Sequence, residues 1–384
     1  MKVALVAPHA LHVKAFWLSL AKALMERGFT VHLYSAGGEE TKELEELGIL
    51  CYEIPFNRFV APLSDLRMAL ALYTAFRRER YDVVHNFTIK ANVFGALAAR
   101  AAGCPRIIDM VLGLGYAFSG RKGWRGRALR LVATILYRIG FAACSKACLI
   151  NSDNYEEVLK LGLLSPDKAV LIKSATGVNL SIFSMEAVDA KALNDIRNEI
   201  DAEPGAPVVL MAGRLFWSKG VREFFEAAKA LAPDYPQARF LLVGPAEAES
   251  PEAVPQAYLR QQLDTQIRWL GFRTDMRELM ALADIFVLPS YYGEGLPQVL
   301  QEAVALGKPV VTTDNVGCRE AVQHNQNGFL IPVRDSRALT EAIRKLLEQP
   351  DLCARFGVQS RLLAERDFDS AKLTQRILTE LYGL

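Results

Sequence analysis

The sequence lacks several features that would place it in a specialised class. Its cysteines form no CxxC pair, no secretory-signal pattern opens the chain, and no apolar run reaches the ~18 residues that a membrane-spanning helix requires. The net charge is only +2, so the overall charge does not favour a protein that binds polyanions. We therefore expect a cytosolic chain with reduced, buried thiols and without a transmembrane helix.

Two α/β domains are indicated by the length and by the order of the predicted elements. The chain has 384 residues, 51% of them apolar, and a domain typically takes ~150 residues. Short apolar runs alternate with amphipathic stretches, which is typical of doubly wound parallel sheets. Such sheets bind ligands at the carboxyl ends of their strands. The predicted strands are Lys2–Pro8, Val31–Tyr34, Cys51–Ile54, Asp82–Phe87, Arg106–Val111, Cys148–Asn151, Val170–Lys173, Val208–Ala212, Phe240–Val243, Ile267–Leu270, Ile285–Leu288 and Val310–Thr312.

The predicted helices alternate with these strands, and a polar connection separates the two domains. The connection covers 184–203, after which the alternation of strands and helices starts again. The helices with the clearest boundaries are Lys14–Arg27, Thr41–Leu47, Ser64–Arg80, Asn92–Ala102, Trp124–Ala143, Asn154–Leu161 and Ser370–Tyr382.

The stretch 290–302 carries the strongest functional signal in the sequence. It places a loop of Ser, Tyr and Gly between a buried strand and a helix that begins near Pro297 and ends at Gly307. The positive end of such a helix binds anions, phosphate especially. Glu294 and Glu302 add two carboxylates, each of which can accept hydrogen bonds from neighbouring hydroxyls of a ribose or a hexose. These acids suggest a ligand that carries a sugar as well as phosphate.

Two cations lie in a loop that follows another predicted strand. Arg214 and Lys219 come after Val208–Ala212 and before a helix. A solvated basic turn would explain them if they stood alone. Together with the loop of Glu294, they indicate a phosphate-binding site.

At these residues the sequence resembles the retaining GT-B glycosyltransferases, in particular glycosyltransferase family 4. Glu294 and Glu302 match the family's pair of acids separated by seven residues, and the similarity is specific over 208–345. The other matching motifs, in the family's order, are Met211–Arg214, Trp217–Gly220, Leu242–Gly244, Ile285–Ser290, Asp314–Glu320 and Asn327–Phe329. The resemblance implies two Rossmann-like domains that face each other across a cleft. It assigns 1–180 to an acceptor-binding domain, with the final helix at 368–384 crossing back onto it, and 181–367 to a nucleotide-sugar-binding domain.

The resemblance also implies roles for individual residues in the second domain. Arg214 and Lys219 would hold the donor diphosphate, Glu302 the ribose diol and Glu294 a hydroxyl of the donor sugar. Arg214, Lys219 and Glu294 are therefore the predicted catalytic residues. The full predicted donor site is Gly213, Arg214, Lys219, Phe272, Arg273, Glu294, Gly295, Leu296 and Glu302, with the nucleobase near Phe272 and Arg273. The family requires no metal ion, and no cofactor is expected.

The first domain resembles the bacterial transferases that extend undecaprenyl-diphosphate-linked sugars, including the N-acetylgalactosaminyltransferases of bacillosamine pathways. This resemblance rests on Phe87–Asn92 and Gly113-Leu-Gly115 in the first domain, and on Trp217–Gly220 in the second. His9, Lys90 and Asn92 are the predicted acceptor-binding residues. The family's glycine pair after the first strand and its histidine near the reacting carbon are absent from their usual places. His9, His12 and His85 therefore stay open as candidates for a general base, although a structural role is the favoured interpretation of each.

A basic segment without acids points to a membrane surface. No Asp or Glu occurs between Asp109 and Asp153, whereas basic and apolar residues alternate there. A basic amphipathic helix is typical of such a surface element. The predicted membrane-facing residues are Arg121, Lys122, Trp124, Arg125 and Arg127. A helix packed on the sheet with a solvated basic face is the alternative, and nucleic acid is disfavoured because no recognition motif accompanies the charge.

These observations favour a metal-independent transferase located on the inner face of the cytoplasmic membrane. It would move a hexosyl unit, an N-acetylhexosaminyl unit by preference, from a UDP-sugar to a polyprenyl-diphosphate-linked sugar. A nucleotide-sugar 2-epimerase and a non-catalytic subunit that binds sugar nucleotides are the alternatives. Gly113-Leu-Gly115 lacks the third glycine of a nicotinamide fingerprint, and Asp367-Phe-Asp369 precedes a helix that it would cap, so neither motif indicates a cofactor or a metal.

Overall fold

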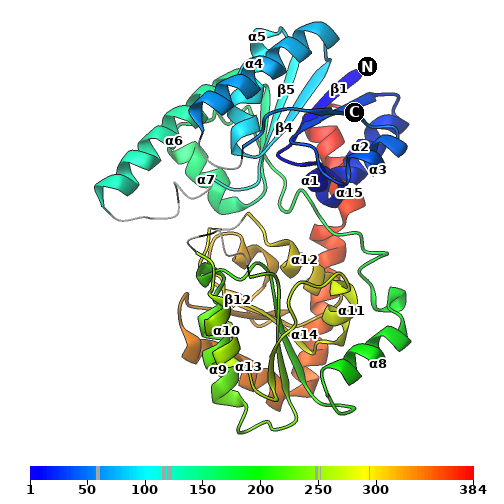
Figure 1. Cartoon of the computed structure of the whole chain (residues 1–384), viewed down its shortest axis with the longest axis vertical. Coiled ribbons are helices and arrows are strands. Elements are labelled where there is room, and N and C mark those ends of the chain that lie inside the picture. The colour runs from blue at the N-terminus through cyan, green and yellow to red at the C-terminus, as the bar shows by residue number, and fades with distance from the viewer. Residues whose placement is uncertain (58–60, 115–117, 119–122, 247–249, 251, 294) are drawn as a thin grey trace. The chain divides into compact units, whose positions relative to one another are not determined.

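The computed structural model describes 1–57, 61–114, 118, 123–246, 250, 252–293 and 295–384. The chain divides into two compact units (Figure 1), the first made of Met1–Thr176 with Ser370–Leu384 and the second of Gly177–Asp369. The boundary lies four residues before the position expected from the sequence, and the final helix belongs to the first unit.

The first unit is built on a seven-stranded parallel sheet with the order β3-β2-β1-β4-β5-β6-β7. Its strands are β1 Lys2–Val6, β2 Thr30–Ser35, β3 Leu50–Glu53, β4 Val83–Phe87, β5 Arg106–Val111, β6 Lys146–Leu149 and β7 Ala169–Leu171. The direction of strand addition reverses between β1 and β4. In open parallel sheets, ligands bind beyond the carboxyl ends of the strands at such a reversal.

Helices cover both faces of this sheet, because its central strands are apolar on both sides. The helical elements are α1 Ala10–His12, the π-helical turn Val13–Trp17, α2 Leu18–Glu26, α3 Thr41–Glu46, α4 Pro62–Glu79, the π-helical turn Ala91–Gly95, α5 Ala96–Ala101, α6 Trp124–Ala143, α7 Ser152–Lys160, α15 Ser370–Ile377 and the π-helical turn Leu378–Tyr382. One core contains side chains of α2 and α15, and another contains side chains of α4, α5, α6 and α7. These helices are labelled in Figure 1.

The second unit is built on a six-stranded parallel sheet with the order β10-β9-β8-β11-β12-β13 and a single apolar core. Its strands are β8 Val208–Ala212, β9 Arg239–Val243, β10 Ile267–Trp269, β11 Ile285–Leu288, β12 Val310–Thr313 and β13 Gly328–Ile331. Its helices include α8 Ala190–Glu199, α9 Val221–Leu231, α10 Gln256–Gln262, α11 Met276–Leu282, α12 Gln298–Ala305, α13 Ser336–Glu348 and α14 Pro350–Leu363. Here the strand order reverses between β8 and β11, which are hydrogen-bonded neighbours.

Most predicted elements are present, and the differences have local causes. β6 ends at Leu149, earlier than predicted, because the Asn151 side chain accepts a hydrogen bond from Asn154 N and begins α7 instead. The predicted polar connection contains α8, in which Ile196 is the one buried residue, so its apolar periodicity was too sparse to detect. The strand β13 was not predicted. It begins at Gly328, where a side chain would lie 1.9 Å from the Val310 carbonyl oxygen of the neighbouring strand.

Candidate functional site

The loop that carries Arg214 and Lys219, called the basic loop below, follows β8 at the point where the strand order of the second unit reverses. Gly213 leaves the strand with φ +150°, and a Cβ on Gly244 of the next loop would lie 1.8 Å from the Gly213 oxygen. The two loops therefore touch through their backbones. Arg214 is exposed, with its guanidinium carbon 4.8 Å from the centre of the Phe216 ring. Among the residues that the structure describes, no carboxylate pairs with Arg214.

The loop that follows β11 is hydrogen-bonded to this basic loop. The backbone carbonyl oxygen of Ser218 accepts hydrogen bonds from Tyr291 N at 2.8 Å, from Tyr292 N at 3.1 Å and from the Ser290 hydroxyl at 3.2 Å. Lys219 lies next to this acceptor, and its Nζ is 5.9 Å from the centre of the Tyr292 ring. The structure thus brings the predicted cations close to the start of the loop after β11, called the acidic loop because the sequence places Glu294 in it. The two loops follow β8 and β11, which are neighbours in the sheet.

Polar residues at the end of β12 hold the same loop from its other side. Asn315 Nδ2 donates to the backbone carbonyl oxygen of Tyr292 at 2.8 Å, and the Thr313 hydroxyl donates to the backbone carbonyl oxygen of Ser290. No role was predicted from the sequence for Ser218, Thr313 or Asn315. Thr313 and Asn315 carried a signal, because polar residues at the end of a buried strand in a parallel sheet meet at the carboxyl edge, whereas Ser218 lies further along the loop after β8.

The helix α12 begins one residue later than predicted, with Pro297 at its N-cap. Gly295 and the buried Leu296 immediately precede it, whereas Glu294 lies outside the described residues. Glu302 lies inside the helix and is half-buried. Burial raises the pKa of the Glu302 carboxyl to about 7, and a hydrogen bond from the Gln298 side chain opposes this shift. A carboxyl group in this state is sensitive to a ligand that donates hydrogen bonds to it.

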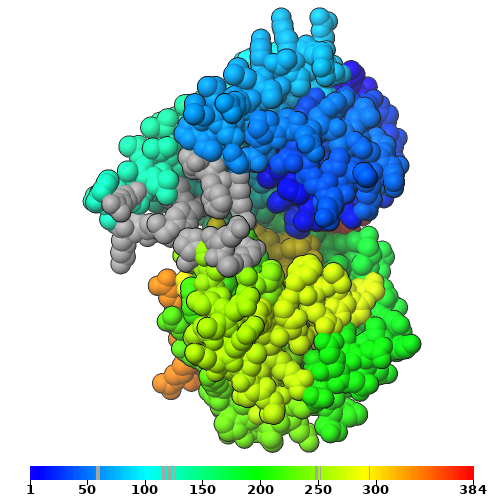
Figure 2. All heavy atoms as spheres, viewed as in Figure 1, coloured from blue at the N-terminus to red at the C-terminus, as the bar shows by residue number. Residues whose placement is uncertain are grey.

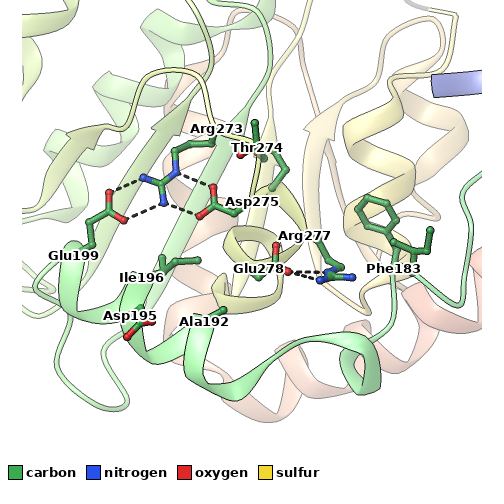
Figure 3. Close-up of a pocket in the computed structure, with 12 residues that line it drawn as sticks. Phe183, Ala192, Asp195, Ile196, Glu199, Arg273, Thr274, Asp275, Arg277 and Glu278 are labelled. Atoms are coloured by element: carbon green, nitrogen blue, oxygen red, sulfur yellow. Dashed lines mark hydrogen bonds and ion pairs between the residues drawn. The ribbon is translucent and has the colours of Figure 1, made fainter. Parts of the chain in front are cut away.

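The predicted nucleobase residues follow β10. Phe272 is 71% exposed, which is unusual for a large aromatic side chain. Arg273 makes paired hydrogen bonds with the Glu199 carboxylate of α8, at 2.6 and 3.0 Å, and with the Asp275 carboxylate, at 2.8 and 2.7 Å (Figure 3). These bonds raise the pKa of Arg273 and lower that of Asp275. The guanidinium therefore fixes the loop to α8, and Phe272 is the side chain of the pair that stays open to a ligand.

The predicted acceptor residues of the first unit have different surroundings. His9 is exposed in the loop that follows β1. Lys90 Nζ lies 2.5 Å from the Asp65 carboxylate in an ion pair that is largely buried, and the buried Asn92 donates from Nδ2 to the Met110 oxygen at 2.9 Å. Thr88, just before Lys90, has φ +78°, which is rare for a β-branched residue and marks local strain at the end of β4.

His85 has the position of a core residue. It is fully buried, and its Nδ1 is 2.8 Å from the Tyr382 hydroxyl, which joins β4 to the end of the chain. Burial lowers the pKa of His85 to about 3. Full burial and the contact with Tyr382 give His85 the surroundings of a structural histidine.

The helix α6 presents an apolar stripe to the surface. Its inner face buries Tyr137 and Phe141. Its outer face exposes Trp124 (70%), Leu131 (61%), Val132 (54%), Ile135 (50%) and Ile139 (44%) together with the exposed Arg127, and α6 lies at the surface of the first unit (Figure 2). Arg130 pairs with Glu157. Arg121, Lys122 and the side chain of Arg125 lie outside the described parts of the chain. The outer face is thus more apolar than a merely solvated basic face.

The described residues contain neither a metal-binding cluster nor a membrane-spanning helix. No group of three or more His, Cys, Asp or Glu side chains there is arranged to hold a metal ion. No helix in the same ranges has both the length and the apolar character needed to cross a membrane.

Two family models match the chain. The model described as glycosyl transferases group 1 matches residues 194–362. The model described as glycosyl transferase 4-like domain matches residues 13–147.

Two curated relatives are similar over most of their length. The N,N'-diacetylbacillosaminyl-diphospho-undecaprenol alpha-1,3-N-acetylgalactosaminyltransferase of Campylobacter jejuni is 31% identical over 382 residues, which cover 98% of this chain and 97% of that protein. The UDP-Gal:alpha-D-GlcNAc-diphosphoundecaprenol alpha-1,3-galactosyltransferase of Escherichia coli is 27% identical over 296 residues, covering 76% of this chain and 73% of that protein.

Solved structures show the same fold. HepE of Anabaena, determined in complex with UDP, superposes with a TM-score of 0.80 at 22% identity and full coverage of both chains. WaaG, a glycosyltransferase involved in lipopolysaccharide biosynthesis, superposes with a TM-score of 0.77 at 18% identity, again over the whole of both chains.

Proposed function

The chain belongs to the group 1 glycosyltransferases, of family 4 and the GT-B fold, and on this premise we propose that it transfers a hexosyl unit from a UDP-sugar to a polyprenyl-diphosphate-linked sugar. The preferred donor in this proposal is a UDP-N-acetylhexosamine. One observation carries the donor site. The loop of Arg214 and Lys219 and the loop that leads to α12 leave neighbouring strands at the reversal of strand order, and they are hydrogen-bonded through the Ser218 oxygen.

In the proposed donor site each group has a distinct task. Arg214 and Lys219 bind the diphosphate together with the backbone at Gly295 and the N-terminus of α12, because these groups supply positive charge and N–H donors. Glu302 accepts hydrogen bonds from the ribose diol, and Glu294 accepts from a hydroxyl of the donor sugar. Phe272 offers an aromatic face to the nucleobase.

We propose that the reaction retains the anomeric configuration. The bond between the donor C1 and the diphosphate oxygen breaks, and the acceptor hydroxyl oxygen bonds to C1 on the same face. The departing diphosphate takes the proton of that hydroxyl, so the step needs no protein base. Arg214, Lys219 and the start of α12 stabilise the negative charge that grows on the diphosphate in the transition state. This positive charge replaces the role that a metal ion has in other transferases, so the proposed reaction is metal-independent.

The acceptor is proposed to bind the first unit at the carboxyl edge of its sheet, with the exposed His9 as a contact. Of the other two predicted acceptor residues, Lys90 is paired with Asp65 and Asn92 is bonded to the Met110 backbone oxygen. Support comes from the relatives, because the names of both curated proteins contain a sugar linked to undecaprenol through a diphosphate. Such acceptors are amphiphiles at a membrane surface. The apolar outer face of α6 and the basic residues of its N-terminal part would hold the protein on the inner face of the cytoplasmic membrane.

The stereochemistry and the metal requirement test this mechanism together. The product formed from an α-linked UDP-sugar should carry a new α-linkage, read from the anomeric proton coupling by NMR, and EDTA should leave the rate unchanged. A β-linked product would refute retention. Loss of activity in EDTA with recovery in Mn²⁺ or Mg²⁺ would refute the metal-independent mechanism.

A further inference from the structure

The loops that follow β1, β2 and β3 in the first unit form one continuous surface. Ala36 N donates to the Pro8 oxygen at 3.2 Å, and Ala10 N donates to the Gly37 oxygen at 3.1 Å. Backbone hydrogen bonds thus join the loop of His9 to the loop of Gly37 and Gly38. Glu53 ends β3, the next strand of the sheet, so its side chain belongs to the same carboxyl edge.

Two consecutive glycines shape this surface. Gly37 has φ +78°, and a Cβ there would lie 2.5 Å from Oε1 of Glu53. Gly38 has φ +140°, and a Cβ there would lie 2.5 Å from Cε1 and 2.8 Å from Nδ1 of His9. The absence of both side chains therefore lets the Glu53 carboxylate and the His9 imidazole rest on the loop. We call Gly37, Gly38, His9 and Glu53 the glycine platform.

The functional groups of the platform are available to a ligand. His9 and Glu53 are both exposed, and in the described ranges neither side chain makes a hydrogen bond or an ion pair. They lie at the carboxyl edge of the sheet, and His9 lies in the loop after β1, one of the two strands at the reversal of strand order. This edge is where ligands of doubly wound sheets bind.

The charge around the platform selects the chemistry of the ligand. Glu39 and Glu40 directly follow Gly37 and Gly38 in the same loop, and Glu40 Oε2 is 3.0 Å from the position that a Cβ on Gly38 would occupy. The neighbouring cation Lys14 is 2.5 Å from the Glu43 carboxylate, which offsets its charge. An anionic group would be repelled here, whereas hydroxyl and amide groups can donate to carboxylates and exchange hydrogen bonds with an imidazole.

We propose that the glycine platform binds the terminal sugar of the acceptor, that Glu53 is a specificity residue of this subsite, and that this sugar is uncharged. The inference rests on the proposed transfer to a lipid-linked saccharide. It adds the class of the sugar, a residue to which no role was assigned from the sequence, and a function for the two glycines.

The test compares two synthetic acceptors that differ in one group. Both carry a short polyprenyl diphosphate, one linked to an N-acetylhexosamine and the other to a hexuronic acid. The variants are Glu53→Gln and Glu53→Lys, and Glu46→Gln is the matched control because Glu46 is an exposed acid on α3 of the same unit. Donor affinity is measured separately by calorimetry with UDP.

Glu53→Gln should raise KM for the neutral acceptor by about 10- to 100-fold, the effect of losing one hydrogen bond to a charged group, with UDP affinity unchanged. Glu53→Lys should shift the preference toward the hexuronic acid, a gain that unfolding cannot produce. Wild-type KM and an unchanged acceptor preference in both Glu53 variants would overturn the subsite. Transfer by the wild type to neither acceptor, with UDP still bound, would overturn the proposed function instead.

Discussion

The state of Glu302 gives the sharpest prediction about the donor site. Burial raises the pKa of its carboxyl to about 7 from the usual value of 4.5, so the unliganded protein holds a proton there at slightly acidic pH. A ribose diol donates its hydrogen bonds to the ionised carboxylate, so donor binding has to release this proton. We therefore expect the affinity for a UDP-sugar to fall by up to ~10-fold for each pH unit below 7, since one pKa unit corresponds to ~1.4 kcal/mol.

The assay is calorimetry with UDP-N-acetylglucosamine between pH 6 and pH 8, without acceptor. This ligand suits the test because its diphosphate is esterified at both ends and does not titrate in that range. Glu302→Gln should weaken binding at pH 8, where the wild type is ionised, and should remove the pH dependence. A wild-type affinity that is constant from pH 6 to pH 8, or a Gln variant that keeps the wild-type slope, would refute the role of Glu302.

The same carboxyl predicts a change in stability with a defined sign. Because the folded protein binds this proton more tightly than the unfolded chain, the contribution of Glu302 to stability is present at low pH and is lost as pH rises from about 4.5 to about 7. Glu302→Gln should therefore raise the free energy of unfolding at pH 8, by on the order of 3 kcal/mol at most, and by much less at pH 5. A donor-binding residue that costs stability when empty is the expected pattern for a functional group.

Three further predictions concern other parts of the molecule. In steady-state assays, Arg214→Ala and Lys219→Ala should each lower kcat by roughly 10²–10³, whereas the control Arg337→Ala, at an exposed position on α13, should match the wild type. Equal rates in all three variants would contradict the proposed charge stabilisation by Arg214 and Lys219. The double variant Leu131→Ser with Ile135→Ser on α6 should reduce sedimentation with anionic vesicles, because each apolar side chain contributes ~1.5–3 kcal/mol when it leaves water. The control Val358→Ser in the second unit should not reduce it, and a double variant that sediments like the wild type would leave α6 without a membrane role. His85→Ala should lower the free energy of unfolding, measured in urea, by ~1–3 kcal/mol, because it leaves the Tyr382 hydroxyl unpaired, and UDP affinity should stay at the wild-type value. A large loss of UDP affinity in the folded variant would show that His85 is more than a core residue.

Sequence patterns predicted the elements whose chemistry is local. β8 and β11 are continuous apolar runs with the bounds that their composition indicated, and Pro297 and Gly307 mark the two ends of α12 to within one residue. The neighbouring positions of these two strands follow from the rules of doubly wound sheets. The meeting of the basic loop and the acidic loop was therefore predictable in outline.

The features that were missed depend on contacts between distant segments. The Ser218 oxygen binds a loop that lies about seventy residues further along the chain, and Glu199 meets Arg273 from a helix that the sequence did not reveal. No role was predicted for the consecutive glycines Gly37 and Gly38 after β2, yet a Cβ on Gly38 would lie 2.5 Å from the ring of His9 in the β1 loop. For α6 the sequence predicted a basic amphipathic helix, but composition alone did not show which of its apolar side chains face outward and which are buried.

The most direct test of the central claim is a mass-spectrometric assay of transfer. The purified chain is incubated with a panel of UDP-hexoses and UDP-N-acetylhexosamines and with undecaprenyl diphosphate linked to a single N-acetylated sugar. We predict that the lipid-linked product gains the mass of one hexosyl unit, in stoichiometric balance with released UDP, and gains it most readily from a UDP-N-acetylhexosamine. Conversion of the donor to an epimer without acceptor, or donor binding with no transfer to the lipid-linked sugar, would contradict it.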